Sequence, residues 1–145
     1  MERKENKMKE EITFEDFIKI DIRIGTIVEV CDFEKAKKPA YQLKIDFGDL
    51  GIKKSSAQIT NLYSKEELIN KQVTAIFNLK PRQIANFISE VLVLGIYNTE
   101  GNVVLLQASK KIQNGQQINW KTDWLLLALS DKTILAFVWY TFAAE

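Results

Sequence analysis

Two polar segments of this chain carry the side chains whose types could do chemistry. One spans residues 53–60 (KKSSAQIT) and the other residues 78–90 (NLKPRQIANFISE). Each sets lysine or arginine among amides and hydroxyls, and together they supply the candidate contact residues Lys53, Lys54, Ser56, Gln58, Asn78, Lys80, Arg82 and Ser89. Such cations suit the phosphates of a nucleic acid, while neutral polar groups can hydrogen-bond sugars and base edges. A solvated surface loop without a ligand is the alternative interpretation of residues 78–90.

Few residues of this chain are of types that could catalyse a reaction. The chain has no histidine and one cysteine, Cys31. An internal disulfide, a zinc site built on cysteine and histidine, and a histidine general base are therefore excluded. Neighbouring acids such as Glu66 and Glu67 diverge on a helix and cannot act as an acid–base pair. We therefore expect no catalytic residue, no metal, no cofactor and no enzymatic activity.

The overall composition fits one folded domain. The 145 residues are 46% hydrophobic and 27% charged, which is enough apolar material for a packed core. The formal net charge is only +1, so any nucleic-acid site must be a local patch rather than a generally basic surface. The first eleven residues are almost wholly polar and do not resemble a signal peptide, which predicts a cytoplasmic location.

Two short helices are predicted from their capping signals. Thr13 with Asp16 predicts a helix over Phe14–Ile18, and Ser64 with Glu67 predicts a second helix over residues 65–69.

Alternation of apolar and polar residues predicts strands over residues 20–30, 41–47, 52–59, 73–77 and 103–107. Gly25 interrupts the first strand as a bulge or barrel corner would. The apolar run at residues 90–97 predicts a strand buried on both faces. Because Pro81 cannot donate to a ladder, residues 78–90 are expected to form a loop or a turn of helix at the barrel rim.

Short strands with one helix between the third and fourth indicate an all-β fold, a five-stranded Greek-key β-barrel of the OB-fold type with short helices. In such barrels, strands 2 and 3 and the adjoining loops form the usual nucleic-acid groove. Both polar segments map there. So does the lysine-rich loop at residues 34–39, although such a loop is more often plain surface.

Several segments resemble the CsaA proteins, secretion chaperones of the tRNA-binding-domain (OB-fold) family, which also includes the C-terminal domain of many methionyl-tRNA synthetases. They are DIRIGTIVEV (21–30), FEKAKKPAYQLKIDFG (33–48), KKSSAQIT (53–60), LINKQV (68–73) and NLKPRQIANFISEVLVLG (78–95). The resemblance implies a non-enzymatic OB-fold homodimer that binds tRNA or tRNA-like RNA. It also implies an export chaperone, with unfolded precursor proteins and the export machinery as its partners. The alternative is a tRNA-binding translation accessory similar to the synthetase domain.

By residue, the resemblance assigns RNA contacts to Asn78, Lys80, Pro81, Arg82, Ser89 and Glu90. Synthetase-type members have methionine after the Ser-Glu pair. Here Val91 follows, as in CsaA-type members. The family's dimer contacts lie near the N-terminal segment and the outer edge of the barrel, which makes Phe14, Phe17 and Ile18 candidate dimer-interface residues. Packing of these residues on their own barrel is the alternative.

Three regions are predicted: a flexible N-terminal arm (1–11), the tRNA-binding OB-fold domain (12–119) and a hydrophobic C-terminal tail (120–145) that the resemblance does not cover. The tail is long enough to span a membrane, but Asp131 and Lys132 at its centre would each cost about 2.5–3.5 kcal/mol. No stable membrane insertion is therefore expected. A hydrophobic hairpin and an appended, dispensable segment are the remaining alternatives.

Overall fold

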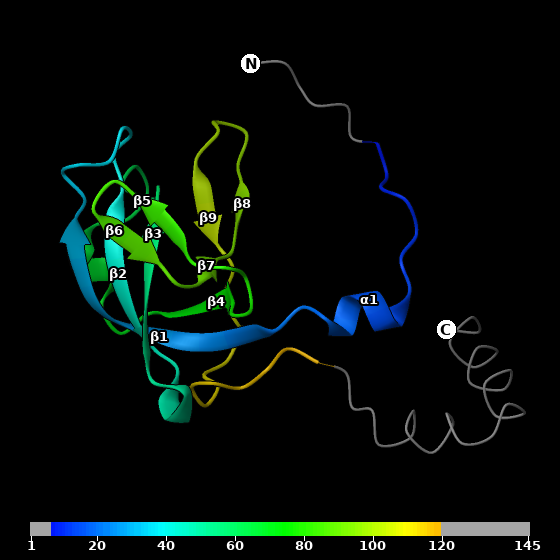
Figure 1. The fold of residues 1–145 in the computed structure, drawn as a ribbon. Coiled ribbons are helices and arrows are strands. Elements are labelled where there is room, and N and C mark those ends of the chain that lie inside the picture. Colours follow the sequence, from blue (N-terminus) through cyan, green and yellow to red (C-terminus); the bar gives the residue numbers. More distant parts are fainter. Residues whose placement is uncertain (1–6, 120–145) are drawn as a thin grey trace, which may run out of the picture.

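The computed structural model describes residues 7–119; most of the predicted arm and the whole predicted tail lie outside this range. The elements follow one another as α1 (Phe14–Ile18), β1 (Ile22–Asp32), β2 (Tyr41–Asp46), the 3-10 turn η1 (Gly48–Leu50), β3 (Ile52–Ala57), α2 (Lys65–Leu68), β4 (Gln72–Ile76), β5 (Arg82–Ile84), β6 (Phe87–Ser89), β7 (Leu92–Val93), β8 (Gly95–Tyr97) and β9 (Val103–Leu105) (Figure 1).

Five of these strands form one antiparallel sheet in the order β3-β2-β1-β4-β7, which curls into a nearly closed barrel. Two further two-stranded sheets are the hairpins β5–β6 and β8–β9. Figure 1 shows both hairpins at the same end of the barrel, with β8–β9 projecting beyond it. The predicted all-β barrel of the OB-fold type is confirmed.

The core follows from the alternation in β2. Leu43 is 1% exposed and Ile45 is fully buried, while Lys44 between them faces solvent. The remaining buried apolar side chains of this core are Ile27, Tyr41, Phe47, Ile59, Leu68, Val73, Ala75, Val91 and Leu105. Period-two patterning alone therefore predicts this strand correctly.

The first strand departs from its predicted pattern at two points. A Cβ at Gly25 would lie 2.6 Å from Ile45 Cγ2 and 2.7 Å from Phe47 Cε1, so this glycine permits close packing and β1 continues through it. The register shift that marks a bulge instead falls between Ile27 and Glu29. Val28 is the extra residue at this bulge and has no partner in β2. It is 41% exposed, although the alternation of the sequence grouped it with the buried residues.

Both predicted helices are present with their capping boxes. The Thr13 hydroxyl accepts from the Asp16 N–H, and the Ser64 hydroxyl accepts from the Glu67 N–H. Hydrogen bonds from the Ser64 backbone and hydroxyl hold the pKa of the Glu67 carboxyl below its ordinary value. Helix α2 buries Leu68 completely in the barrel, whereas α1 has no buried residue.

Two predictions for the second half of the chain were wrong. Residues 78–90 were expected to form a loop or a turn of helix, but they contain the hairpin β5–β6, because Pro81 lies just before β5 where no ladder donor is required. The run at residues 90–97 was expected to be one doubly buried strand, but it divides into β7 and β8. The second part leaves the barrel for a two-stranded hairpin, so Ile96 is 60% and Tyr97 73% exposed.

Side chains join the two edges of the barrel at what we call the seam, between β3 and the Ser89-Glu90 pair. The Glu90 N–H donates to the Lys54 carbonyl at 2.8 Å, and the Lys54 N–H donates to Glu90 Oε2, also at 2.8 Å. Beside them, the Ser56 N–H donates to Ser89 Oγ at 3.3 Å. Side-chain oxygens thus replace the ladder acceptors that a regular strand pair would supply to β3.

No helix in residues 7–119 is long and apolar enough to cross a membrane.

The seam makes Glu90 a stability residue. We expect Glu90→Ala to lower the free energy of unfolding by about 1–3 kcal/mol, because the half-buried Lys54 N–H is left without its acceptor. Glu90→Gln keeps an acceptor oxygen and should recover most of this stability. Urea unfolding followed by circular dichroism measures both variants, and equal stability of the alanine variant and the wild type would contradict the structural role of the carboxylate.

Candidate nucleic-acid interface

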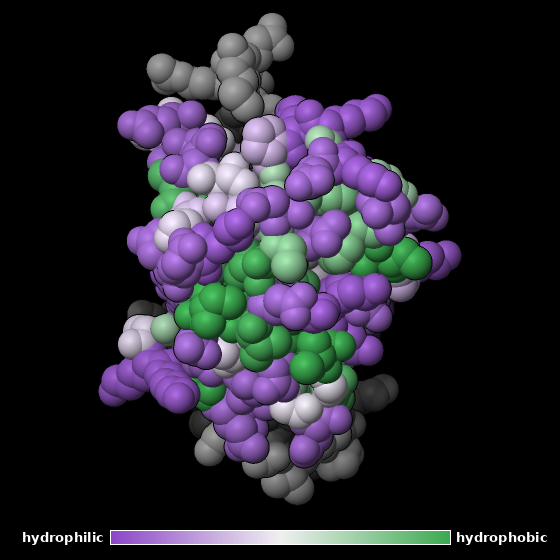
Figure 2. Space-filling model, turned by 90° about the vertical axis from the view of Figure 1, so that its left-hand side faces the viewer, coloured by the Kyte–Doolittle hydropathy of each residue, from purple (hydrophilic) through white to green (hydrophobic). Residues whose placement is uncertain are grey.

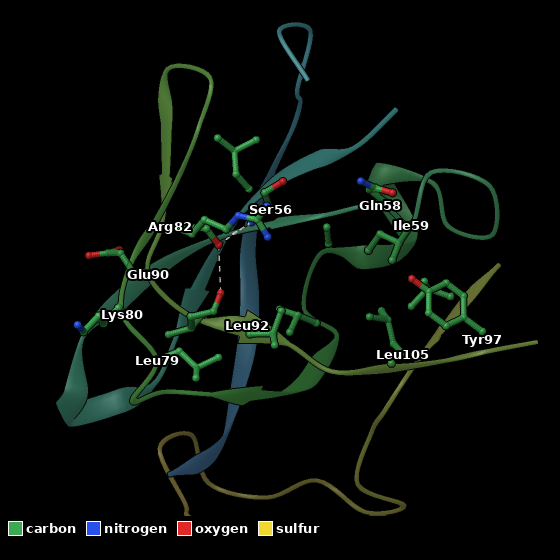
Figure 3. A pocket seen from close by; sticks show the side chains of 17 residues that line it. Ser56, Gln58, Ile59, Leu79, Lys80, Arg82, Glu90, Leu92, Tyr97 and Leu105 are labelled. Atoms are coloured by element: carbon green, nitrogen blue, oxygen red, sulfur yellow. Dashed lines mark hydrogen bonds between the residues drawn. The ribbon is translucent and has the colours of Figure 1, made fainter. Parts of the chain in front are cut away.

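A groove of about 530 Å³ lies between the two hairpins, over the end of β3 and over β7. We call it the main groove. Its principal lining residues are Ser56, Gln58, Ile59, Leu79, Lys80, Arg82, Ile84, Ser89, Glu90, Leu92, Tyr97 and Leu105 (Figure 3). Tyr97 and Lys80 lie at opposite ends of it in this view. The two polar segments of the sequence, distant along the chain, therefore share one concave surface.

The groove contains five of the eight predicted contact residues: Ser56, Gln58, Lys80, Arg82 and Ser89. Of these, Lys80 and Arg82 are exposed and form no ion pair with any residue in the described range 7–119. Arg82 is held by its pairing with Ser89 across the β5–β6 hairpin. Arg82 therefore lies on a short hydrogen-bonded hairpin and Lys80 lies two residues before it. Two such positive charges suit an anionic ligand.

The other three predicted residues lie outside the main groove. Lys53 and Lys54 place their ammonium groups over the rings of Phe77 and Phe87, each 5.7 Å from the ring centroid. The Asn78 amide donates to the Lys19 carbonyl at 2.6 Å and accepts from the Asp21 N–H at 2.9 Å. Asn78 therefore connects the end of β4 to the segment that joins α1 to β1. Both the nitrogen and the oxygen of its side-chain amide are engaged in these hydrogen bonds.

Ser89 and Glu90 line the groove but are engaged in the seam. Besides accepting from Ser56, the Ser89 hydroxyl donates to the Val91 carbonyl at 3.1 Å. Fully buried Ser55 donates to the same carbonyl at 3.0 Å. These hydroxyls satisfy backbone groups of the fold. Lys80, Arg82, Gln58 and Ser56 therefore remain the predicted residues of the groove best placed for a ligand.

Sequence reasoning missed the apolar wall of the groove. Leu79 is 48%, Leu92 47% and Tyr97 73% exposed. The position of Tyr97 next to the turn at residues 98–102 could have indicated its exposure from the sequence. A two-stranded hairpin that leaves the barrel exposes both faces of its strands. A groove that combines exposed apolar side chains with two cations suits a ligand that has flat or apolar parts as well as charge.

A smaller hollow of about 240 Å³ adjoins the main groove and shares Tyr97, Gln58, Ile59 and Val103 with it. We call it the second hollow. Its own polar lining comes from Lys38, Thr60, Asn61 and Asn102. The lysine-rich loop of the sequence therefore reaches this surface through Lys38.

No cluster of three or more potential metal ligands occurs within the part of the chain that the structure describes.

Comparison with known proteins identifies the family. Residues 22–117 match the family model described as a putative tRNA binding domain. Methionine–tRNA ligase of Parabacteroides distasonis is 36% identical over 115 residues, which are 79% of this chain and 17% of the enzyme. The corresponding ligase of Pyrococcus horikoshii is 37% identical over 117 residues, or 81% of this chain and 16% of the enzyme. The chain thus spans less than a fifth of these curated relatives.

Two solved structures are matched over their full length. The crystal structure of chaperone CsaA from Bacillus anthracis is 48% identical, with a TM-score of 0.72 over 76% of this chain and 100% of that one. The CsaA chaperone protein from Picrophilus torridus is 58% identical, with a TM-score of 0.71 over 75% of this chain and 100% of that one. With its barrel, its groove and this similarity to the full length of both chaperones, the protein belongs to the tRNA-binding domain family, in the CsaA group.

Proposed function

We propose that this protein is a non-catalytic, cytoplasmic chaperone of the CsaA type that binds tRNA or tRNA-like RNA in its main groove. As a homodimer, it also holds unfolded precursor proteins during export. The observation that carries the RNA part is the pair Lys80 and Arg82, exposed at the groove and without ion-pair partners among residues 7–119.

The local charge of the groove supports an RNA ligand even though the whole chain is nearly neutral. Among the lining residues, Lys80 and Arg82 are opposed only by Glu90. One oxygen of that carboxylate accepts the Lys54 N–H, which directs part of its charge toward the backbone of β3. A positive groove on a neutral protein attracts phosphate locally without general affinity for polyanions.

The salt dependence of tRNA binding tests this assignment. Replacing both Lys80 and Arg82 with alanine should weaken tRNA binding and lower the slope of log K against log salt concentration by about 0.7–0.9 for each phosphate that is no longer neutralised. The matched control is Lys44→Ala with Lys65→Ala, which removes the same charge from residues paired with Glu29 and Asp32. Electrophoretic shift across a salt series gives the slope, and an equal slope for both double variants would reject the groove.

Exposed apolar surface supports the polypeptide part of the proposal. Figure 2 shows a band of hydrophobic residues across the middle of one face of the protein, with hydrophilic residues on both sides. The main groove adds Leu79 and Leu92, each nearly half exposed. Contiguous apolar surface on a folded protein commonly marks a site for protein partners, and unfolded precursors offer apolar side chains to it.

Helix α1 supports the homodimer. Phe14 is 42% and Ile18 53% exposed, and the rings of Phe14 and Phe17 lie 6.1 Å apart. A helix of five residues is too short to be stable alone. Since none of its residues is buried on its own barrel, a second copy is the partner that we propose for this apolar face. Two grooves on one particle would then bind a tRNA-sized ligand with avidity.

Substituting the α1 face tests the dimer. Phe14→Ala with Phe17→Ala and Ile18→Ala should convert the dimer to a monomer in sedimentation velocity, and should weaken tRNA binding because a monomer binds without avidity. The melting temperature of the barrel should change little, because α1 buries nothing on it. A dimer that persists in the triple variant would place the interface elsewhere.

A translation accessory that binds tRNA and has no role with polypeptide is the second candidate, favoured by the similarity to methionine–tRNA ligases. Aggregation of a denatured precursor, followed by light scattering with and without tRNA, separates the two functions. A chaperone should suppress scattering at stoichiometric concentration, and tRNA should relieve this suppression if one groove serves both ligands. If the protein binds tRNA tightly but does not reduce the light scattering of the precursor, the translation accessory is favoured.

A further inference from the structure

We propose that the ring of Tyr97 is a stacking platform for an unpaired base of the bound RNA. The nucleotide chain would pass over this ring from the main groove into the second hollow. This inference rests on the proposed RNA-binding function and narrows its ligand to RNA with exposed, single-stranded nucleotides. Its starting observation is that Tyr97 is 73% exposed and lines both hollows.

The backbone that presents Tyr97 is well fixed by hydrogen bonds. Tyr97 pairs with Val103 at the end of the β8–β9 hairpin. In the turn that follows, the Asn98 side-chain oxygen accepts the N–H groups of Glu100 at 3.0 Å and Asn102 at 2.9 Å. An exposed aromatic ring on an ordered support needs little further ordering when it binds a flat ligand.

A second set of interactions ties this hairpin to the rest of the groove. The Asn61 amide donates to Asn102 Oδ1 at 2.9 Å, which links the turn to the segment between β3 and α2. Buried Leu105 in β9 joins the same hairpin to the core. Tyr97 is therefore not needed to hold the hairpin in place, and its exposed ring is available for a ligand.

Both hollows that the ring borders contain cations. Lys80 and Arg82 line the main groove, and Lys38 lines the second hollow. Glu90 is the only acidic residue among the lining residues of the two, and Glu100 of the hairpin turn lines neither. This arrangement matches a strand whose base stacks on the tyrosine while its neighbouring phosphates meet positive charge in both directions.

Gln58 adds a polar group at the boundary, because it lines both hollows. Its amide can donate to and accept from the edge of a stacked base. The faces of bases in an RNA duplex are covered by their neighbours, so only loops, bulges and ends can use an aromatic platform. The chemistry of this surface therefore favours unpaired nucleotides over duplex RNA.

The test compares Tyr97→Phe, Tyr97→Leu and Tyr97→Ala in the full-length chain. The probes are tRNA, a single-stranded twelve-nucleotide RNA and a duplex RNA of equal length, with affinity measured by fluorescence anisotropy. Tyr97→Phe should bind the single strand like the wild type. Tyr97→Leu and Tyr97→Ala should bind it about 5-fold to 150-fold more weakly, the usual range for one base–aromatic stack. Their salt slopes should stay unchanged, because the uncharged ring neutralises no phosphate.

Contrary outcomes are distinct from failure of the proposed function. Wild-type affinity in Tyr97→Leu would overturn stacking, since leucine keeps the apolar contact without the ring. Equal weakening for duplex and single strand would overturn the preference for unpaired nucleotides. Weaker suppression of precursor aggregation by Tyr97→Ala with unchanged RNA binding would assign the ring to polypeptide instead. A wild-type chain that binds none of the three RNAs would reject the RNA function itself.

Discussion

The barrel depends on the hydrogen bonds of the seam. Its two sheet edges, β3 and β7, share no regular ladder, and Ser89 and Glu90 supply side-chain oxygens where backbone carbonyls would otherwise accept. These bonds fix where the chain passes from β6 to β7. The position of the β5–β6 hairpin, and with it the position of Arg82 at the groove, follows from that point.

This use of Ser89 and Glu90 separates two kinds of residue within one sequence motif. Asn78, Ser89 and Glu90 hold backbone segments together, whereas Lys80 and Arg82 form no ion pair within residues 7–119 and face the groove. The motif at residues 78–90, which resembles a set of ligand contacts, therefore also contains residues that support the fold. The supports fix the backbone on either side of Lys80 and Arg82, and preorganisation of this kind lowers the ordering cost of binding.

The barrel surface combines features that suit two different ligands. Localised positive charge attracts phosphate, while exposed leucines and the α1 face offer apolar contact. Because the chain as a whole is nearly neutral, the excess of positive charge is a local property of the groove. On the proposed function, the groove, where both properties meet, is the surface for which RNA and polypeptide would compete.

The sequence by itself determined those features whose physical causes lie within a few residues. Both capping boxes join residues three apart, and the alternation of β2 requires only that one face of a strand be buried. The cations of the groove, Lys80 and Arg82, were also identifiable from their residue types and their neighbours. Only the tertiary structure decided the rest. The bulge beside Val28 depends on pairing with a distant strand, the role of Glu90 depends on a partner 36 residues away, and Tyr97 is exposed because its strand leaves the barrel. Local sequence patterns do not identify such long-range partners, because the same residue types are compatible with a buried strand and with an open groove.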